Sequence, residues 1–222
     1  MFGTEETPID VRIATTRDEI EACKALSSEV YLREYGVRLT DSQLNPIGYR
    51  ERFPDRFAMG FINGRFAVCA GWYVGETYAQ TFGRLTEAEI RAALDEAGCP
   101  EAISRVRVEY TKLVIKPEFA GKGLGRRFLG MTHSRQFLEV DGEVPLILLC
   151  GRRSMFGLFQ SVGIRTRALK PFPWYRNHER YRSAADPMES RLVIPELDID
   201  PHWFELRFSD EYPETLGAIH AV

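Results

Sequence analysis

The sequence predicts an α/β fold in which a mixed central sheet is flanked by helices. Short apolar stretches rich in β-branched and aromatic residues alternate with stretches in which apolar residues recur every three or four positions. Asn63-Gly64 separates two of the apolar stretches and favours a hairpin turn, because both turn positions need a positive φ. The stretch 144–150 is apolar throughout, as expected of a central strand. The predicted order is β-α-β-β-α-β-α-β-α-β-β.

The N-terminal segment alternates polar and apolar residues at 11–15, which predicts a first strand. Thr16 and Glu19 then have the spacing of a capping box, in which each side chain bonds the backbone N–H of the other residue. Apolar residues at helical spacing follow and predict a helix that runs to about Tyr35. Residues 37–55 show no clear period and contain two prolines, so they are predicted to form a loop.

The two strands of the predicted hairpin cover 57–62 and 65–74. A second capping box, formed by Thr86 and Glu89, predicts the start of another helix. Gly98 predicts the end of that helix, because glycine is favoured just past a helix C-terminus. These signals are local, and each fixes a boundary of one element.

The second half of the chain supplies the remaining elements. A stretch rich in β-branched residues at 106–116 predicts a long strand, and a helix is predicted from about 123 to 139. A short helix at 155–162 follows the apolar central strand. The final two strands are predicted at 165–169 and 191–194.

The composition excludes several classes of protein. Of the 222 residues, 44% are apolar, and no linker or repeat interrupts the pattern, so we expect one domain over 1–222. The formal net charge of −3 argues against a general nucleic-acid binder. The four cysteines form no Cys-x-x-Cys pair, so no metal site or disulfide framework is indicated. The N-terminus lacks the features of a signal peptide, and no apolar run reaches the ~20 residues that span a bilayer. We therefore expect a soluble, cytoplasmic protein.

Three glycines, Gly121, Gly123 and Gly125, lie between a predicted strand and the next helix. Glycines let the backbone turn sharply and let a ligand approach closely. The free N–H groups at a helix N-terminus attract anions, and Lys122 and Arg126 add positive charge. The spacing differs from the dinucleotide-binding fingerprint, and the Ser or Thr of a Walker A loop is absent. A pyrophosphate site is predicted; the alternative is that the glycines only shape the turn.

Two stretches are informative together. The first is Leu113-Val-Ile-Lys-Pro117 followed by Gly121-Lys-Gly-Leu-Gly-Arg126, and the second is the strand at 144–150 followed by Phe159-Gln-Ser-Val-Gly-Ile164. They resemble motifs A and B of the GCN5-related N-acetyltransferase (GNAT) superfamily, over about 107–129 and 144–165. On this reading, 166–222 holds the C-terminal strands and an extension.

The resemblance implies the acyl-CoA N-acyltransferase fold, with acyl-CoA or acetyl-CoA as co-substrate and no metal. It implies that the pantetheine arm pairs with the backbone of Leu113, Val114 and Ile115. It also implies that the pyrophosphate is bound by the backbone amides of the turn, which are those of Gly121, Lys122, Gly123, Leu124, Gly125 and Arg126. The two central strands would separate and let the acyl group pass between them.

Glu109 matches the position of the general-base glutamate of several GNAT enzymes. It precedes Leu113 by four residues, and a strand alternates faces, so both residues are predicted to lie on the same side. The alternative is that Glu109 is a solvated strand residue, or one paired with Lys112 or Arg107. His133, on the helix after the turn, is predicted to be a surface or capping residue.

Two positions depart from the GNAT pattern. Ala120 stands where the superfamily usually has Arg or Gln, and Phe159 stands where it often has the tyrosine that protonates the departing thiolate. Backbone amides can bind a pyrophosphate without the first side chain. The second departure leaves the general acid unidentified, and water is one candidate.

The stretch Val108-Glu-Tyr-Thr-Lys-Leu113 also resembles a GNAT-like branch that contains the acyl-homoserine-lactone synthases and the long-chain N-acyl amino acid synthases. Leu26-Ser-Ser-Glu-Val-Tyr31 is similar to an N-terminal motif of the same branch. Ser27 and Lys112 replace the two arginines of these motifs. In that branch the donor is usually an acyl-carrier protein and the acceptor an amino acid or its derivative.

These observations predict an enzyme that transfers an acyl group from a pantetheine thioester to an amine of a small molecule or peptide. The alternatives are an enzyme like the synthases of the narrower branch, which uses an acyl-carrier protein, and an inactive module that senses acyl-CoA. A third alternative is that the turn binds another phosphate compound. No nucleic-acid partner is expected, and a homodimer is left open.

Overall fold

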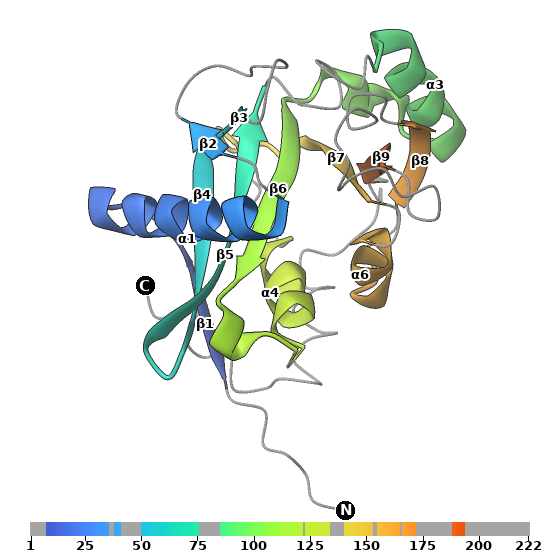
Figure 1. Ribbon diagram of the computed structural model, residues 1–222. Helices are drawn as coiled ribbons and strands as arrows, with labels where there is room; N and C mark the ends of the chain where they lie inside the picture. Colours follow the sequence, from blue (N-terminus) through green and yellow to red (C-terminus); the bar gives the residue numbers. More distant parts are fainter. Residues whose placement is uncertain are drawn as a thin grey trace, which may run out of the picture.

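The computed structural model describes residues 8–35, 38–40, 50–75, 85–121, 123–133, 140–152, 155–164, 166–171 and 188–193. Within these residues, seven strands form one mixed sheet in the order β1-β4-β5-β6-β7-β9-β8 (Figure 1). The strands are β1 (Ile9–Ile13), β4 (Arg56–Ile62), β5 (Arg65–Val74), β6 (Arg107–Ile115), β7 (Leu146–Arg152), β8 (Thr166–Pro171) and β9 (Met188–Val193). Neighbouring strands are antiparallel, except that β6 and β7 are parallel.

The helices are α1 (Arg17–Tyr35), α3 (Glu87–Ala97), α4 (Leu124–Thr132) and α6 (Phe156–Ser161), with 3-10 turns η1 (Pro100–Ser104) and η2 (Pro117–Phe119). Helix α1 crosses one face of the sheet over β4, β5 and β6, as Figure 1 shows. The apolar side chains of α3 and η1 pack on the same face, over β7. Helices α4 and α6 lie on the opposite face and share the largest apolar core with β5, β6 and β7.

The predicted order of elements is confirmed from β1 to β9, and the predicted loop at 37–55 is partly wrong. Two short strands, β2 (Arg38–Thr40) and β3 (Arg50–Arg52), pair in parallel there. Three residues are too few to show an alternating pattern, so the sequence carried no signal for them. The helix predicted from 123 to 139 ends at Thr132. Residues 134–139 lie outside the described part of the chain, as do 194–222.

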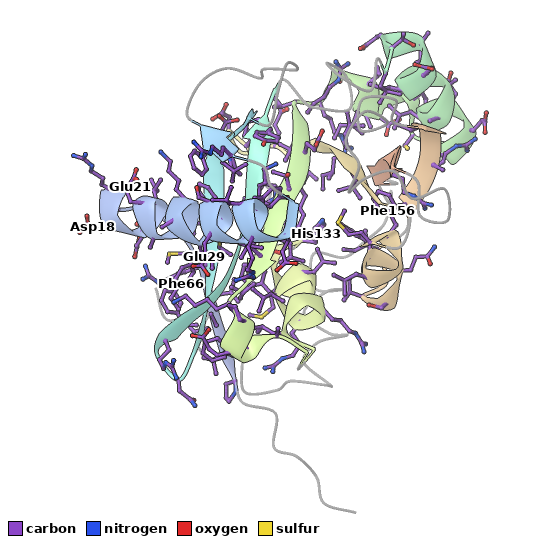
Figure 2. The ribbon with its side chains drawn as sticks, in the orientation of Figure 1. Asp18, Glu21, Glu29, Phe66, His133 and Phe156 are labelled. Carbon is purple, nitrogen blue, oxygen red and sulfur yellow. The ribbon has the colours of Figure 1, made fainter. Side chains whose placement is uncertain are left out.

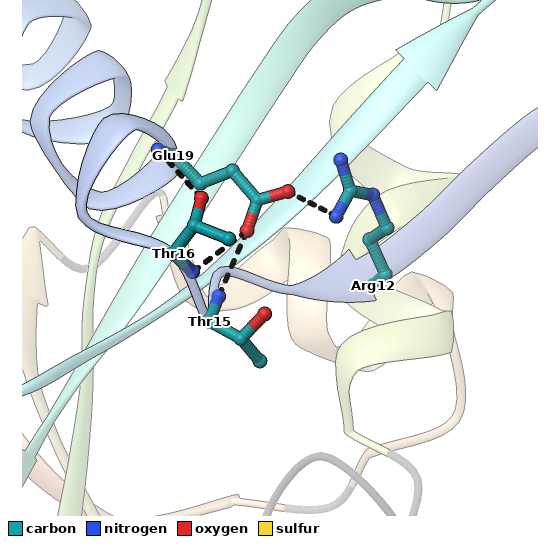
Figure 3. A network of polar contacts seen from close by, with 4 residues as sticks. All are labelled: Arg12, Thr15, Thr16 and Glu19. Atoms are coloured by element: carbon teal, nitrogen blue, oxygen red, sulfur yellow. Dashed lines mark hydrogen bonds and ion pairs between the residues drawn. The ribbon is translucent and has the colours of Figure 1, made fainter.

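Both predicted capping boxes are present, and the first one joins α1 to β1 (Figure 3). The backbone N–H groups of Thr15 and Thr16 donate to Glu19 Oε2 at 2.9 and 3.0 Å, and the N–H of Glu19 donates to Thr16 Oγ1 at 3.3 Å. Arg12 of β1 forms an ion pair with the same carboxylate. The two backbone bonds, followed by Arg12, lower the pKa of Glu19 from 4.5 to about 2. The box therefore fixes where the chain leaves β1 and enters α1.

The predicted hairpin is also confirmed. Asn63 and Gly64 join β4 to β5, with φ of 51° and 70°. Both values lie in the left-handed region that this two-residue turn requires. The hairpin sets the register of β4 on β5 and so contributes to the position of β6, the strand next to β5.

Candidate functional site

Strand β6 contains a β-bulge at its centre. Its pairing with β5 advances two residues along β5, from Cys69 to Gly71, but three along β6, from Val114 to Thr111. Lys112 lies within the bulged segment and has a φ of 55°. A side chain in this left-handed conformation costs roughly 1–2 kcal/mol, so the surrounding structure has to hold it there. A bulge interrupts the alternation of side chains between the two faces of a strand.

The bulge decides which residues of β6 share a face. Val108 and Tyr110 precede it and belong to the core beneath α4 and α6, and Leu113 and Ile115 follow it and pack against the same core. Glu109 lies between Val108 and Tyr110, so its side chain is on the opposite face, which α1 covers. The prediction that Glu109 and Leu113 lie on one face is therefore wrong, because it assumed an uninterrupted strand.

Glu109 is buried on the α1 face together with a cation. Its exposed fraction is 1%, and that of Lys112 is 5%. Tyr73 pairs with Glu109 across β5 and β6. The Nζ atom of Lys112 lies 4.5 Å from the ring centroid of Tyr31, on α1, and 5.9 Å from that of Tyr73. The acidic Glu109 and the basic Lys112 are thus both buried under α1, three residues apart on the same strand.

Two alternatives considered for Glu109 can be compared with this geometry. A solvated glutamate is excluded by its burial. Arg107, suggested as a partner, forms an ion pair with Glu87 at the start of α3. The role of Glu109 as a base is not decided by burial alone and stays a prediction.

The glycine turn joins β6 to α4 through η2. Gly121 and Gly123 have φ of 75° and 71°, and a Cβ atom built on either would meet no atom within 4 Å among the described residues. These two glycines are therefore required by the backbone conformation, and the space beside them is open. A Cβ atom on Gly125 would lie 3.2 Å from Ile115 Cδ1, so this glycine allows α4 to approach β6 closely. Lys122 lies outside the described residues.

The N-terminus of α4 begins at this open turn. Gly123 is its N-cap residue and has no side chain with which to bond the first N–H groups. The N–H groups of Arg126 and Arg127 donate to the carbonyl of Gly123, at 3.1 and 3.2 Å. Those of Leu124 and Gly125 precede them and have no carbonyl acceptor within the helix. Such a terminus, with the positive end of the helix dipole, favours an anion.

Strands β6 and β7 stop pairing midway along β6. Their pairing runs from Arg107 with Leu146 to Tyr110 with Leu149. Beyond this point β6 continues to Ile115 along β5, and β7 continues to Arg152 along β9. The three residues predicted to pair with a pantetheine arm, 113–115, therefore lie on the part of β6 that has left β7.

Phe159 and His133, both singled out in the sequence, are buried neighbours on the α4 side of β6. Phe159 of α6 is buried, and its ring centroid lies 5.3 Å from that of His133. His133 caps the C-terminus of α4 as predicted, but it is buried, with an exposed fraction of 7%. Its Nδ1 atom lies 3.1 Å from the carbonyl oxygen of Leu129. The surface position considered for His133 is wrong, because α6 covers it.

Within the part of the chain that the structure describes, no three His, Cys, Asp or Glu side chains gather as metal ligands. The same residues include no helix of sufficient length and apolar character to cross a membrane. Cys23, Cys69 and Cys99 are buried free thiols.

No protein-family model matches the chain, and no curated protein matches it in sequence. Solved structures do match. MesI, a CoA-dependent acyl-homoserine lactone synthase, has a TM-score of 0.54 and 12% identity, over 92% of this chain and 95% of its own. FeeM, an N-acyl amino acid synthase from uncultured soil microbes, has a TM-score of 0.50 and 11% identity, over 85% and 92%. The AHL synthase LasI has a TM-score of 0.50 and 12% identity, over 86% and 92%. The chain shares the fold of these solved structures, a mixed α/β sheet with flanking helices. At such low identity the likeness concerns the fold alone.

In this fold the predicted site residues separate into two groups. The described residues of the glycine turn lie on the α4 side of β6, together with Leu113 and Ile115, and Glu109 lies on the α1 side. Val114 belongs to the α1 side too, since it packs with Cys69 and residues of α1. Sequence reasoning did not single out Tyr110 or Trp72, which pack together beneath α4 and α6. The alternation of side chains along a strand could have identified Tyr110, because it places this residue on the face opposite Glu109.

Proposed function

We propose that the protein is an acyltransferase that moves an acyl group from a pantetheine thioester, acyl-CoA, to an amine. One observation carries the proposal. The glycine turn lies on the α4 side of β6, next to Leu113 and Ile115, and Glu109 is buried on the α1 side, one residue before the pairing with β7 ends. A donor on the side of α4 and an acceptor on the side of α1 would meet there. Binding both substrates at once supplies the proximity that direct transfer needs.

The donor would bind along the α4 side. Its pyrophosphate would lie at the N-terminus of α4, against the amides from Gly121 to Gly125, where the positive φ of two glycines leaves open space, while the N–H of Arg126 stays bonded to the carbonyl of Gly123. Its pantetheine arm would pair with the backbone of β6 at 113–115, in the gap that opens toward β7. Backbone amides would supply both contacts, so the absence of an Arg or Gln side chain at Ala120 does not prevent them.

The chemical step would be a direct aminolysis. The amine nitrogen attacks the thioester carbonyl carbon, a C–N bond forms, the C–S bond breaks, and the thiolate leaves. Glu109 would accept the proton that the amine nitrogen loses, directly or through a water molecule. Main-chain amides of β6 would stabilise the developing charge on the carbonyl oxygen. The thiolate would take its proton from solvent or from a group still to be identified.

The buried Lys112 favours a narrower version of this function. It lies on the α1 side of β6, as Glu109 does, and its ammonium group is held against Tyr31. An acceptor with a carboxylate beside its amine would place opposite charges against Lys112 and Glu109. An N-acyl amino acid or homoserine lactone synthase-like activity is the second candidate on this ground. An acyl-carrier protein is then an alternative donor, since it presents the same pantetheine thioester.

Two measurements test the proposal in order. The first is a thermal-shift titration with CoA, acetyl-CoA and a long-chain acyl-CoA; a ligand at 100 times its Kd adds about 2.7 kcal/mol of stability. The second is release of free thiol from the best donor with matched acceptors, such as phenylalanine against phenethylamine, which lacks the carboxylate. Faster turnover of phenylalanine would support the carboxylate requirement at Lys112.

Each outcome separates the candidates. Stabilisation by all three compounds, followed by turnover, supports the acyl-CoA-dependent enzyme. Stabilisation without thiol release for any amine identifies a sensor module. If no compound stabilises the protein, the acyl-CoA donor is ruled out. A loaded acyl-carrier protein is then the next donor to assay, and failure there too would overturn the reading of the glycine turn.

A further inference from the structure

A group of five buried side chains lies on the α4 and α6 side of β6, where β6 and β7 separate. We call it the Tyr110 cluster; its members are Trp72, Tyr110, Thr132, His133 and Phe159. The Tyr110 ring centroid lies 5.5 Å from that of Trp72 and 4.6 Å from that of His133. Tyr110 is the last residue of β6 in register with β7. The cluster therefore borders the point of separation.

The hydroxyl groups of the cluster have partners. Tyr110 Oη and Thr132 Oγ1 are 3.2 Å apart, and Thr132 Oγ1 donates to the carbonyl of Phe128 at 2.9 Å. Because Thr132 donates to that carbonyl, the Tyr110 hydroxyl is the donor in their shared bond. Burial raises the pKa of Tyr110 well above its usual value, so this hydroxyl keeps its proton.

The imidazole of His133 leaves one atom without a partner. Its Nδ1 atom lies 3.1 Å from the carbonyl oxygen of Leu129, which only accepts hydrogen bonds, so Nδ1 carries the hydrogen. Burial lowers the pKa of His133 to about 4, which keeps the ring neutral at pH 7. The Nε2 atom is then a bare acceptor. It is buried and has no hydrogen-bond partner among the described residues.

The indole of Trp72 leaves a second such atom, of opposite type. Trp72 has an exposed fraction of 1%, and its Nε1–H donor is buried without a partner among the described residues. A buried polar atom without a hydrogen bond costs roughly 1–3 kcal/mol, and folded proteins usually satisfy such atoms with ordered water. The indole that carries the donor and the imidazole that carries the acceptor both pack against the ring of Tyr110.

We propose that the Tyr110 cluster binds a hydroxyl group. Its O–H donates to His133 Nε2, and its oxygen accepts from the Nε1–H of Trp72. A hydroxyl does both through a single oxygen atom, whereas a carbonyl would serve only Trp72 and an ammonium only His133. The hydroxyl belongs either to resident water or to an organic alcohol carried by the protein. Figure 2 shows His133 at the end of α4 and Phe156 on α6, the two helices that enclose the site. This inference does not depend on the proposed acyl transfer.

Nitrogen-15 NMR of the histidine-labelled wild-type protein tests the site directly. We expect Nδ1 to carry the hydrogen and Nε2 to show the shift of a hydrogen-bonded acceptor. Resident water would give cross-relaxation between the His133 ring protons and the solvent signal. A bound alcohol would instead add mass in the native mass spectrum that is lost on denaturation. An unbonded Nε2, or an Nε2 that accepts from a protein side chain, would overturn the proposal.

Two variants extend the test. His133→Phe removes the acceptor, and the carbonyl of Leu129 stays bonded to the backbone N–H of residue 133, at 3.2 Å in the present structure. We expect loss of the added mass of a bound alcohol and an unchanged or lower Tm. Trp72→Phe removes the donor and keeps the His133 ring as the probe, so here we also expect loss of the cross-relaxation with water. A higher Tm in either variant would mean that the deleted atom had been unsatisfied, and the site dry.

Discussion

Glu109 and Leu113 are four residues apart in β6, yet their side chains lie on opposite faces of the sheet. The bulge at Lys112 produces this relationship, because it adds one residue to β6 without a counterpart in β5. As a result, Leu113 and Ile115 face the glycine turn and α4, and Glu109 and Lys112 are buried toward α1. The bulge thus lies between the residues proposed for the acceptor side and those proposed for the donor side.

Removal of Lys112 should therefore abolish donor binding. Deleting the residue leaves Thr111 opposite Gly71 and Val114 opposite Cys69 in regular pairing, and it removes the bend that the bulge gives β6 just beyond the end of its pairing with β7. The control is Lys112→Gly, which keeps the bulge and relieves the left-handed strain of a side chain at a φ of 55°. We expect CoA binding, measured by calorimetry, in the control and not in the deletion. Equal affinities would show that the bulge does not organise the site.

Glu109→Gln should lower turnover and leave thioester binding intact. Loss of a general base typically costs 10²–10⁴-fold in rate. Glu143→Gln removes a carboxylate from an exposed turn and is the matched control. Thiol release measured at saturating acyl-CoA separates the two variants. Wild-type turnover in Glu109→Gln would remove Glu109 from the mechanism.

Gly123→Glu should abolish binding of CoA. It places a side chain and a negative charge where the pyrophosphate is proposed to lie. Gly64→Glu in the hairpin is a close control, because the φ of 70° resembles the 71° of Gly123 and neither Cβ would meet an atom within 4 Å. Both variants carry the same backbone strain of roughly 1–2 kcal/mol. If both bind CoA equally, the pyrophosphate lies elsewhere.

The stability of the protein should fall in mild acid through His133. Its pKa is lowered from 6.5 to about 4 in the folded chain, so below pH 6.5 the unfolded chain binds a proton that the folded chain does not. The contribution is complete above pH 6.5 and is lost progressively as the pH falls to about 4, by about 3 kcal/mol in total.

Urea unfolding between pH 7 and pH 4 measures this effect. His133→Gln is the comparison, since it keeps a polar side chain that does not titrate. Carboxylates titrate in both proteins, so the difference between their pH profiles isolates His133. Parallel profiles would show that the pKa of His133 is the same in the folded and the unfolded chain.

The sequence allowed prediction of features that depend on neighbouring residues. The capping boxes at Thr16 and Thr86 and the turn at Asn63-Gly64 are set by side chains within a few positions, and all three are present. The bulge at Lys112 could not be predicted in this way. It is a difference in register between two strands that are about 40 positions apart in the chain, and no local pattern encodes that pairing.

The candidate site shows the same division. The glycine turn was predicted because its residues are consecutive. The Tyr110 cluster was not, because Trp72, Tyr110 and His133 come from two strands and a helix and meet only in the folded chain. The burial of His133 depends on Phe159 of α6, which follows it by 26 positions (159 minus 133).

The parallel pairing of β6 with β7 covers only four residue pairs, and it joins the two parts of the sheet, β1-β4-β5-β6 and β7-β9-β8. The antiparallel strands β4 and β5 are joined by a two-residue turn. Strands β6 and β7 are joined by a much longer connection that includes α4, and this segment has to fold before they can pair. Contacts that close longer loops form at a greater entropic cost. We therefore expect each part of the sheet to form before β6 pairs with β7. The gap proposed for the reaction would then form in the last step of folding.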